Sequence, residues 1–307
     1  MNLVEYGIDT SQLREITLAD KPKIDSLLSL APNLGCENCF TNLFVWRGIY
    51  LLKLLYIAED RAVIYNGRDK CIYFPIGRIP SPRELLEIHR AFSENKLLLP
   101  DSRIYNVPPD YPEKFPEARA MFDFDANPGE ADYIYDVEKQ IALTGPKLRK
   151  KRNHIKHFTA QNPNASVEPM GESNFKSVLR FMDSEDDKKH LFAEEVAIAE
   201  AFENFRTLGL YGTVLYSEPG KIAAAAVMGP MSSTAHSVHF EKSDKLVEGA
   251  SQMIVKREAQ SILEHGGKFM NREQDLGDPN LRHAKESLDP DFMYGRLGAK
   301  PRKGATA

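Results

Sequence analysis

The densest set of chemically active side chains follows a short predicted strand near the C-terminus. Residues 271–277 are Asn-Arg-Glu-Gln-Asp-Leu-Gly, an unusual concentration of polar side chains for the end of a strand. If this segment is extended, Asn271, Glu273 and Asp275 project from one face, because side chains alternate along a strand. Their amide and carboxylate oxygens would form an acidic pocket suited to an ammonium group. The alternative is a salt-bridged connection whose polar groups satisfy the backbone.

Two cations lie in the helix predicted directly after this segment. Arg282 and Lys285 are three residues apart, so they share one helix face. A guanidinium and an ammonium group on one face could hold a carboxylate or a phosphate of a substrate. The sequence therefore predicts that residues 271–285 contribute to a binding site.

A histidine and a carboxylate lie near the end of the strand predicted over residues 235–242. Strand alternation places His239 and Glu241 on one face. Such a pair could remove a proton from an attacking amine, as a general base does. A histidine beside a salt-bridged glutamate would give the same sequence, so a purely structural role remains open.

A glycine turn precedes the helix predicted over residues 251–265. Gly249 would let a ligand approach the backbone N–H groups, and the N-terminus of a helix favours anions. Gly249 and Ala250 are therefore candidates for holding a phosphate or pyrophosphate. The alternative is that the glycine only starts the helix.

The most basic stretch of the chain is residues 147–157, in which eight of eleven residues are lysine, arginine or histidine. In a helix these side chains would lie on two sides, one holding Lys147, Lys150, Lys151 and His154 and the other holding Arg149, Arg152 and Lys156. Repulsion among them would destabilise an isolated helix, and the pattern indicates a polyanionic partner such as tRNA or a phosphorylated small molecule. A solvated basic face is the alternative.

The apolar pattern predicts the scaffold that positions these residues. The second half is predicted to contain helices at 146–158, 174–182, 192–208, 251–265 and 281–288, and strands at 210–216, 222–228, 235–242 and 268–271. The first half is predicted to contain helices at 21–30, 40–46 and 82–95, and strands at 61–65 and 71–76. A proline-rich stretch at 107–132 separates the halves, because proline interrupts both helices and strand ladders. We therefore predict two α+β domains, 1–130 and 131–307, with the second carrying the active site.

Composition narrows the function further. With 40 Lys+Arg against 44 Asp+Glu the net charge is -4, so any polyanion site must be a local cluster. Cys36 and Cys39 form one C-x-x-C without a second pair, so we expect reduced thiols, no metal site and a cytoplasmic protein. The longest apolar run, 222–231, is about half a bilayer span, so no transmembrane segment is expected. Signatures of P-loop, Rossmann, zincin and serine-hydrolase proteins are not found.

The element order resembles the GNAT acyltransferase fold, present in tandem. Taken with residues 42–47, 147–154 and 239–242, the segments N-R-E-Q-D-L-G and L-R-x-A-K-E-S resemble a bacterial family related to the C-terminal domain of phosphatidylglycerol lysyltransferases. That family is similar in fold to tandem GNAT proteins and to Fem-type aminoacyl-tRNA-dependent transferases. At the glycine turn, Glu248 stands where the acetyltransferase signature Q/R-x-x-G-x-G/A has its first glycine, and a carboxylate there disfavours a pyrophosphate.

The resemblance implies transfer of an acyl or aminoacyl group to an amine or hydroxyl, with acyl-CoA or aminoacyl-tRNA as the donor. It implies that the helix containing Lys147–Arg152 meets the acceptor-end phosphates of the tRNA or a lipid headgroup. Asn271, Glu273, Asp275, Arg282 and Lys285 would line the substrate pocket, with Glu273 required for transfer. The alternatives are a non-catalytic module that binds tRNA or a phosphorylated ligand, and an acetyl-CoA-dependent N-acetyltransferase. The sequence predicts no oligomeric state.

Overall fold

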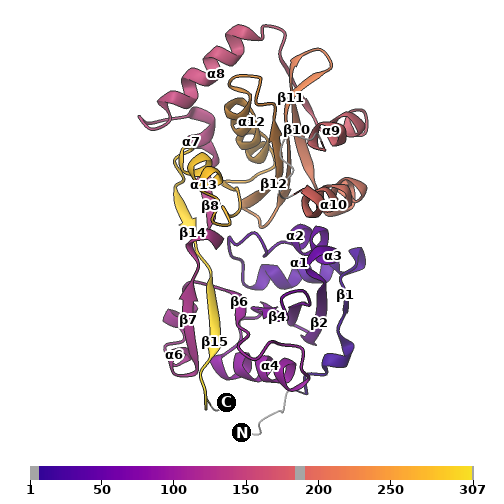
Figure 1. The fold of residues 1–307 in the computed structure, drawn as a ribbon, viewed down its shortest axis with the longest axis vertical. Coiled ribbons are helices and arrows are strands. Elements are labelled where there is room, and N and C mark those ends of the chain that lie inside the picture. The colour runs from indigo at the N-terminus through magenta and orange to yellow at the C-terminus, as the bar shows by residue number, and fades with distance from the viewer. Residues whose placement is uncertain (1–6, 184–190, 306–307) are drawn as a thin grey trace. The chain divides into compact units, whose positions relative to one another are not determined.

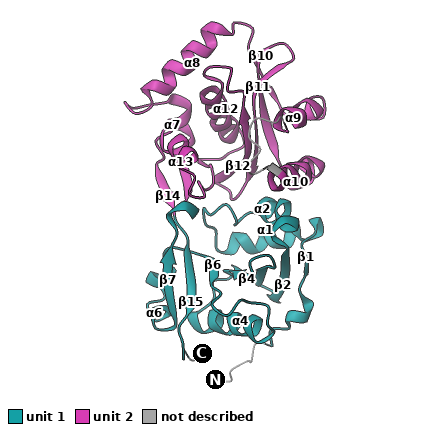
Figure 2. Cartoon of the chain, in the orientation of Figure 1, with its two compact units in different colours: residues 1–130, 295–307 teal, residues 131–294 magenta. Residues whose placement is uncertain are grey.

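Two sheets, each built by its own part of the chain, organise the computed structural model, which describes residues 7–183 and 191–305 (Figure 1). Unit 1 comprises residues 1–130 and 295–307, and unit 2 comprises residues 131–294 (Figure 2). The two mostly antiparallel sheets are flanked by helices, so the predicted fold class is confirmed.

Unit 1 contains a sheet in the order β1-β2-β3-β4-β6-β15-β7, with β5 paired to β3. Its strands are β1 (Arg14–Glu15), β2 (Leu52–Ala58), β3 (Arg61–Asn66), β4 (Cys71–Tyr73), β5 (Ile76–Gly77), β6 (Ile104–Val107), β7 (Phe122–Ala126) and β15 (Leu297–Pro301). Its helices are α1 (Lys21–Leu30), α2 (Phe40–Val45), α3 (Arg47–Tyr50), α4 (Pro82–Glu94), α5 (Tyr111–Lys114) and α6 (Ala118–Met121).

The longest helix of unit 1, α4, shows how the sequence sets local structure. Ser81 caps its N-terminus in a reciprocal pair of hydrogen bonds with Glu84, and Pro82 occupies the first turn, where its missing N–H costs nothing. Leu85 and Phe92 on its inner side are fully buried and pack against the sheet. The helix therefore forms one wall of the core of this unit.

Two sequence predictions in this region were wrong. Strand β15 pairs with β6 and β7 of unit 1, so residues 295–307 do not belong with 131–294. The stretch 107–132 does not break structure throughout, since it contains α5, α6 and β7. The pairing of β15 with β6 and β7 joins segments far apart in the sequence, which local composition does not record.

Unit 2 contains a sheet in the order β14-β8-β13-β12-β11-β10-β9. Its strands are β8 (Asp132–Asp136), β9 (Ser166–Pro169), β10 (Tyr211–Glu218), β11 (Lys221–Pro230), β12 (Ala235–Ser243), β13 (Phe269–Asn271) and β14 (Phe292–Tyr294). Its helices are α7 (Val137–Ala142), α8 (Arg149–Gln161), α9 (Phe175–Met182), α10 (Leu191–Glu203), α11 (Phe205–Leu208), α12 (Ala250–Glu264) and α13 (Pro279–Glu286). The helix expected over 192–208 is thus divided at Asn204 into α10 and α11.

The central helix α12 packs on one face of this sheet, against β10, β11 and β12, with α7 and α8 beside it (Figure 1). Helix α9 contacts β11 and β12 on the other face, and α10 packs on α9. Alanines at 223, 224 and 226 of β11 are fully buried in a cluster with Ile254 of α12. Their small side chains allow the helix and the strand to approach closely.

No helix in the described ranges combines the length and the apolar character that a membrane crossing needs.

Candidate active site

The sheet of unit 2 has an opening beside strand β12, and one of the predicted residues, Glu241, lies there. The parallel ladder between β12 and β13 covers only residues 235–237 and 269–271. Strand β12 continues to Ser243, but within the described parts of the chain no strand pairs with that side of it beyond Ser237. Beyond Ser237, side chains therefore lie along this edge of β12 in place of a hydrogen-bonded strand.

An arginine with two carboxylates bridges the opening. Arg272, the first residue after β13, binds Glu258 of α12 through Nη1–H at 2.6 Å and also contacts the carboxylate of Glu241 on β12. Glu258 is completely buried, whereas 19% of the Glu241 side chain is exposed. The cluster thus joins β12, α12 and the segment after β13, with Glu241 as its carboxylate nearest to solvent.

Burial and charge shift the ionisation of this cluster. Burial raises the pKa of Glu258, and the charge of Glu241 raises it further, while Arg272 acts in the opposite direction. Burial also works against the charge of Arg272, but the two carboxylates outweigh it and raise the pKa of the guanidinium. Arg272 therefore stays cationic, and Glu258 binds its proton more tightly than an ordinary carboxyl does.

The prediction that His239 and Glu241 share one face was wrong. A bulge interrupts the pairing of β11 with β12, since Val227 lies opposite Phe240 while Met228 lies opposite Val238. The extra residue, His239, breaks the alternation on which the prediction relied.

The surroundings of the two side chains place them on opposite faces of the sheet. Met228 packs into the cluster that α12 forms on the sheet, so the next residue, Gly229, faces away from α12. A Cβ on Gly229 would lie 3.0 Å from Nε2 of His239, so the histidine is on that far face. Glu241, by contrast, contacts Arg272 on the side of α12. Only 1% of the His239 side chain is exposed, and the two residues do not act as one pair.

The predicted acidic pocket of Asn271, Glu273 and Asp275 does not form, because the chain turns after β13. Glu273 has a φ of 56°, and its N–H donates to Oδ1 of Asn271 at 2.6 Å. Its carboxylate accepts a hydrogen bond from Ser237 at 2.9 Å and lies 3.4 Å from Nδ1 of His239. Glu273 therefore joins the His239 side of the sheet.

Asp275 belongs to a separate buried network. Its carboxylate accepts hydrogen bonds from Arg282 at 2.8 Å and from Tyr133 at 2.7 Å. The guanidinium of Arg282 lowers the pKa of Asp275 well below the usual carboxyl range, and the Tyr133 hydroxyl adds to this. Lys285 donates to the backbone carbonyls of Arg272 and Gln274, each at 2.5 Å. Arg282 and Lys285 thus fix the turn that carries Arg272, where the sequence had suggested ligand binding.

The glycine turn before α12 is covered by helix α8. Gly249 has a φ of 80°, and a Cβ there would lie 2.4 Å from the carbonyl oxygen of His154 and 2.9 Å from Cβ of Phe158. Ala250 is fully buried, and the Glu248 carboxylate lies 3.5 Å from Nδ1 of His154. The glycine is needed because α8 crosses the turn, and the space predicted for a phosphate holds this helix.

The cations of helix α8 and of Lys147, which precedes it, are arranged differently from the prediction. Lys147 pairs with Asp289 at 2.8 Å, Lys151 points inward, and Arg152 donates to the carbonyls of Leu143 and Gly145. Arg149, Lys150 and Lys156 are exposed, and they form no ion pair with any residue that the structure describes. The helix therefore presents three outward cations, and the rest hold it in place.

Sequence reasoning missed Glu258 and Ser287. Glu258 lies on a helix face that is otherwise apolar, between Val255 and Ala259, and a single carboxylate in such a stripe was the available signal. Ser287 accepts a hydrogen bond from Lys151. Ser287 ends the motif L-R-x-A-K-E-S, but its contact with Lys151 could not be predicted from local spacing, because the two residues are 136 positions apart in the sequence.

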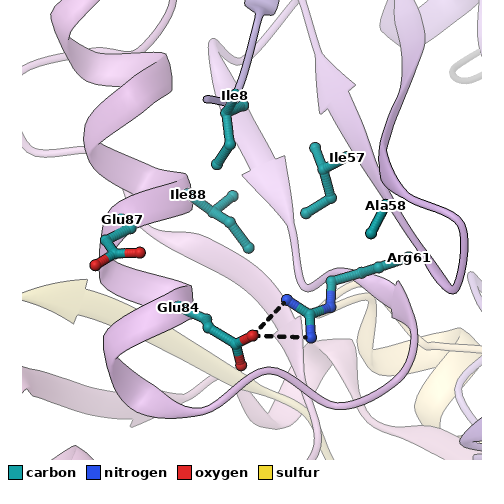
Figure 3. A pocket seen from close by; sticks show the side chains of 7 residues that line it. All are labelled: Ile8, Ile57, Ala58, Arg61, Glu84, Glu87 and Ile88. Carbon is teal, nitrogen blue, oxygen red and sulfur yellow. Dashed lines mark hydrogen bonds and ion pairs between the residues drawn. The ribbon is translucent and has the colours of Figure 1, made fainter. Parts of the chain in front are cut away.

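A small pocket with a volume of about 10 Å³ lies in unit 1 (Figure 3). Ile8, Ile57 and Ile88 contribute apolar walls, and Arg61 closes one side with its guanidinium bound to Glu84 at 3.3 Å. Arg61 also donates to the carbonyl of Arg78, so its cationic group is engaged within the fold. We assign no function to this cavity.

The fold and the layers of the two sheets are those of tandem GNAT-like proteins. The chain belongs to the family described as phosphatidylglycerol lysyltransferase, C-terminal, which matches residues 29–296. A curated relative, an uncharacterized protein of Mycoplasmoides gallisepticum, is 24% identical over 176 residues, and the match spans only 56% of that relative.

Solved structures agree with this assignment. A conserved protein of unknown function from Bacteroides thetaiotaomicron is 27% identical, with a TM-score of 0.85 over 95% of this chain and 99% of that one. L-PGS from Bacillus licheniformis gives a TM-score of 0.63 at 16% identity over 94% and 93% of the two chains. The structure of FemX gives a TM-score of 0.62 at 9% identity, over 94% of this chain and 96% of that one. Family and fold together point to an acyl- or aminoacyl-transferase.

Proposed function

We propose that this protein transfers an aminoacyl group from a tRNA to an amine or hydroxyl acceptor at the opening between β12 and β13. The bond broken is the ester between the amino acid and the tRNA, and the bond formed is an amide or a new ester. The opening is suitable because it brings a carboxylate that is 19% exposed together with a fixed, more deeply buried guanidinium.

The covered glycine turn is the observation that carries the choice of donor. A pyrophosphate at the start of α12 would need the N–H groups around Gly249 to be accessible. The His154 carbonyl oxygen lies over that position, and Ala250 is fully buried. A carbonyl oxygen and the nearby Glu248 carboxylate both disfavour an anion there. This supports aminoacyl-tRNA over acyl-CoA.

The outward cations of α8 supply the electrostatics that a tRNA needs. Arg149, Lys150 and Lys156 are exposed on one helix of a chain whose net charge is -4. Phosphates bound by such a local cluster release counterions, so binding should weaken steeply with salt. This surface fits the acceptor end of a tRNA, where phosphates lie close to the ester that reacts.

Within the opening, we assign Glu241 as the group that accepts the proton of the attacking amine. Its carboxylate is the partly exposed member of the Arg272 cluster. Arg272 holds it in place and supplies positive charge beside the carbonyl group under attack. His239, which is almost fully buried on the other face, instead orients Glu273.

A comparison of donors tests the proposal. The protein is incubated with ethanolamine, which offers both an amine and a hydroxyl, and with either total aminoacyl-tRNA or acetyl-CoA as the donor. We expect protein-dependent product from aminoacyl-tRNA only. Arg149→Glu/Lys150→Glu should weaken tRNA use at least tenfold, while the control Lys176→Glu/Arg180→Glu, two exposed cations on α9, should not. Product from acetyl-CoA alone would overturn the proposal.

A further inference from the structure

Two carboxyl groups in the Arg272 cluster share a single guanidinium. Arg272 donates from Nη1 to Oε2 of Glu258 at 2.6 Å and from Nη2 to Oε2 of Glu241. The Glu258 side chain is completely buried, and only 12% of the Arg272 side chain is exposed. If both carboxyl groups were ionised, one negative charge in excess would lie in the interior, where the loss of solvation makes it costly.

The other groups that face the cluster do not neutralise this excess charge. Tyr135 of β8 is fully buried, and burial raises its pKa far above the usual range, so it is uncharged. Lys151 of α8 forms no ion pair with either carboxyl group in the ranges 7–183 and 191–305, and burial and the charge of Arg272 both lower its pKa. Strands β10 and β11 and helix α7 present apolar side chains toward α12, including Leu215, Met228 and Val137.

The contact between the two carboxyl groups indicates where a proton lies. The groups are within hydrogen-bond reach of each other. Oε1 of Glu258 is buried, and no N–H or O–H group of the residues that the structure describes donates to it. Two ionised carboxylates can only repel at such a contact, because both offer lone pairs. A proton on Glu258, the fully buried member, turns the contact into a hydrogen bond that Glu241 accepts.

This hydrogen bond would restrict the orientation of Glu241. Arg272 binds one of its oxygens, Oε2, and a single contact leaves the carboxylate free to rotate about it. A second contact, from Glu258 on α12, fixes the plane of the carboxylate and therefore the direction of its lone pairs. A general base must point at the proton that it removes, so this orientation matters for the reaction.

Attachment of α12 to the segment after β13 is the alternative role of Glu258. The contact of Glu258 with Arg272 at 2.6 Å makes that attachment by itself. An ionised Glu258 would make it more strongly than a protonated one, because a hydrogen bond between charged groups is stronger than one to a neutral carboxyl group. The two roles therefore require different protonation states of Glu258, and these can be measured.

We propose that Glu258 is a positioning residue for Glu241: it keeps its proton at neutral pH, donates it to Glu241 in a hydrogen bond and directs Glu241 toward the acceptor amine. The inference rests on the function proposed above, in which Glu241 is the base.

The proton of Glu258 is not consumed in the reaction. The amine nitrogen forms a bond to the ester carbonyl carbon, and the bond from that carbon to the tRNA oxygen breaks. Glu241 takes the proton from the nitrogen and passes it to the leaving oxygen, so the step balances without a further reactant. Glu258 acts only through Glu241.

Carbon-13 NMR of the full-length protein, labelled at the glutamate carboxyl carbons, tests the protonation state without any substrate. The signal that is absent from Glu258→Gln belongs to Glu258, and Glu264, which is exposed on the same helix, provides the reference signal of a solvated carboxylate. We expect the chemical shift of a protonated carboxyl group for Glu258 at pH 7. Glu241→Gln removes the neighbouring charge and should move the titration of Glu258 to lower pH. An ionised Glu258 at pH 7 would overturn the inference.

Transfer from tRNA to ethanolamine tests the effect on the reaction. Glu258→Leu removes the donor and should lower kcat at least tenfold with KM for tRNA unchanged, because the base loses its orientation. Glu258→Gln keeps an N–H donor and should lose less than about threefold. Glu264→Gln is the control and should match the wild type, and circular dichroism checks the fold of each variant. Wild-type kcat in a folded Glu258→Leu would overturn the inference.

A pH profile separates positioning from attachment, also where Glu258→Leu does not fold. Once Glu258 loses its proton, the two carboxylates repel, whereas glutamine does not titrate. The ratio of the Glu258→Gln rate to the wild-type rate cancels the titration of the acceptor amine. This ratio should rise over the pH range in which NMR shows Glu258 losing its proton. A ratio that stays constant over that range would exclude the positioning role.

The two proposals can fail separately. If the wild type moves no amino acid from tRNA, the proposed function is wrong, whatever the protonation state of Glu258. If transfer proceeds but Glu258 is ionised at pH 7, the function stands and the positioning role is excluded.

Discussion

The close approach of helix α8 to the glycine turn gives a stability prediction whose size follows from the structure. In the variant Gly249→Ala, the alanine would have to adopt a φ of 80°, and its Cβ would lie 2.4 Å from the His154 carbonyl oxygen. The positive φ costs about 1 kcal/mol, and the forced shift of α8 adds about 1–3 kcal/mol, giving about 2–4 kcal/mol in all.

Gly145 provides a matched control. Its φ is 88°, but nothing lies within 4 Å of the position that a Cβ would occupy. Gly145→Ala should therefore cost only the backbone term, about 1 kcal/mol. The difference between the two variants isolates the contact with α8.

Guanidinium denaturation followed by far-UV circular dichroism measures both variants. The single tryptophan, Trp46, lies in unit 1, so its fluorescence does not report on the site of either substitution. Equal destabilisation of Gly249→Ala and Gly145→Ala would refute the reasoning, because α8 would then not press on the turn. The turn would be available to a pyrophosphate, and the case against acyl-CoA would lose its main support.

Three further predictions follow from the charges and packing of unit 2. Burial raises the pKa of Glu258 above 4.5, so the stability that the Glu258 side chain contributes declines as pH rises above that value. Glutamine does not titrate. The free energy of unfolding of Glu258→Gln, relative to that of the wild type, should therefore rise between pH 5 and pH 8 in urea titrations. Arg282 lowers the pKa of Asp275, so Asp275→Asn should cost about 1–3 kcal/mol at pH 7 and less as pH falls below 3.8, and a constant cost would contradict the assigned ion pair. Phe158 is 1% exposed and packs between α8 and α12. Phe158→Ala should lower the free energy of unfolding by about 3–5 kcal/mol, and a decrease below 1 kcal/mol would mean that α8 is not packed there.

Local sequence signals predicted the central strands and the main helices of unit 2, but they did not predict β8, β9, β14 or α7. The glycine-opened helix, expected over residues 251–265, is α12 (Ala250–Glu264), and the three successive strands are β10, β11 and β12. Apolar periodicity and turn residues carry this information within each segment. The family resemblance rested on motifs in the same region, and the match over residues 29–296 confirms it.

The site itself was less predictable, because its geometry depends on contacts between distant segments. One bulged residue, His239, was enough to separate it from Glu241. The expected pocket around Glu273 failed because a positive φ turns the chain. The pairing of Lys151 with Ser287 joins α8 to the segment after α13, and no spacing rule reaches across that distance.

The most direct test of the account is the number of amino acids that each protein molecule moves from tRNA to ethanolamine. Total tRNA charged with labelled amino acids is supplied in about a hundredfold excess, and labelled product is counted over time. The account predicts many turnovers per molecule, reduced at least tenfold by Glu241→Gln in a variant that keeps its circular dichroism spectrum. Binding of charged tRNA with no product would contradict it and would identify a module that binds tRNA without chemistry.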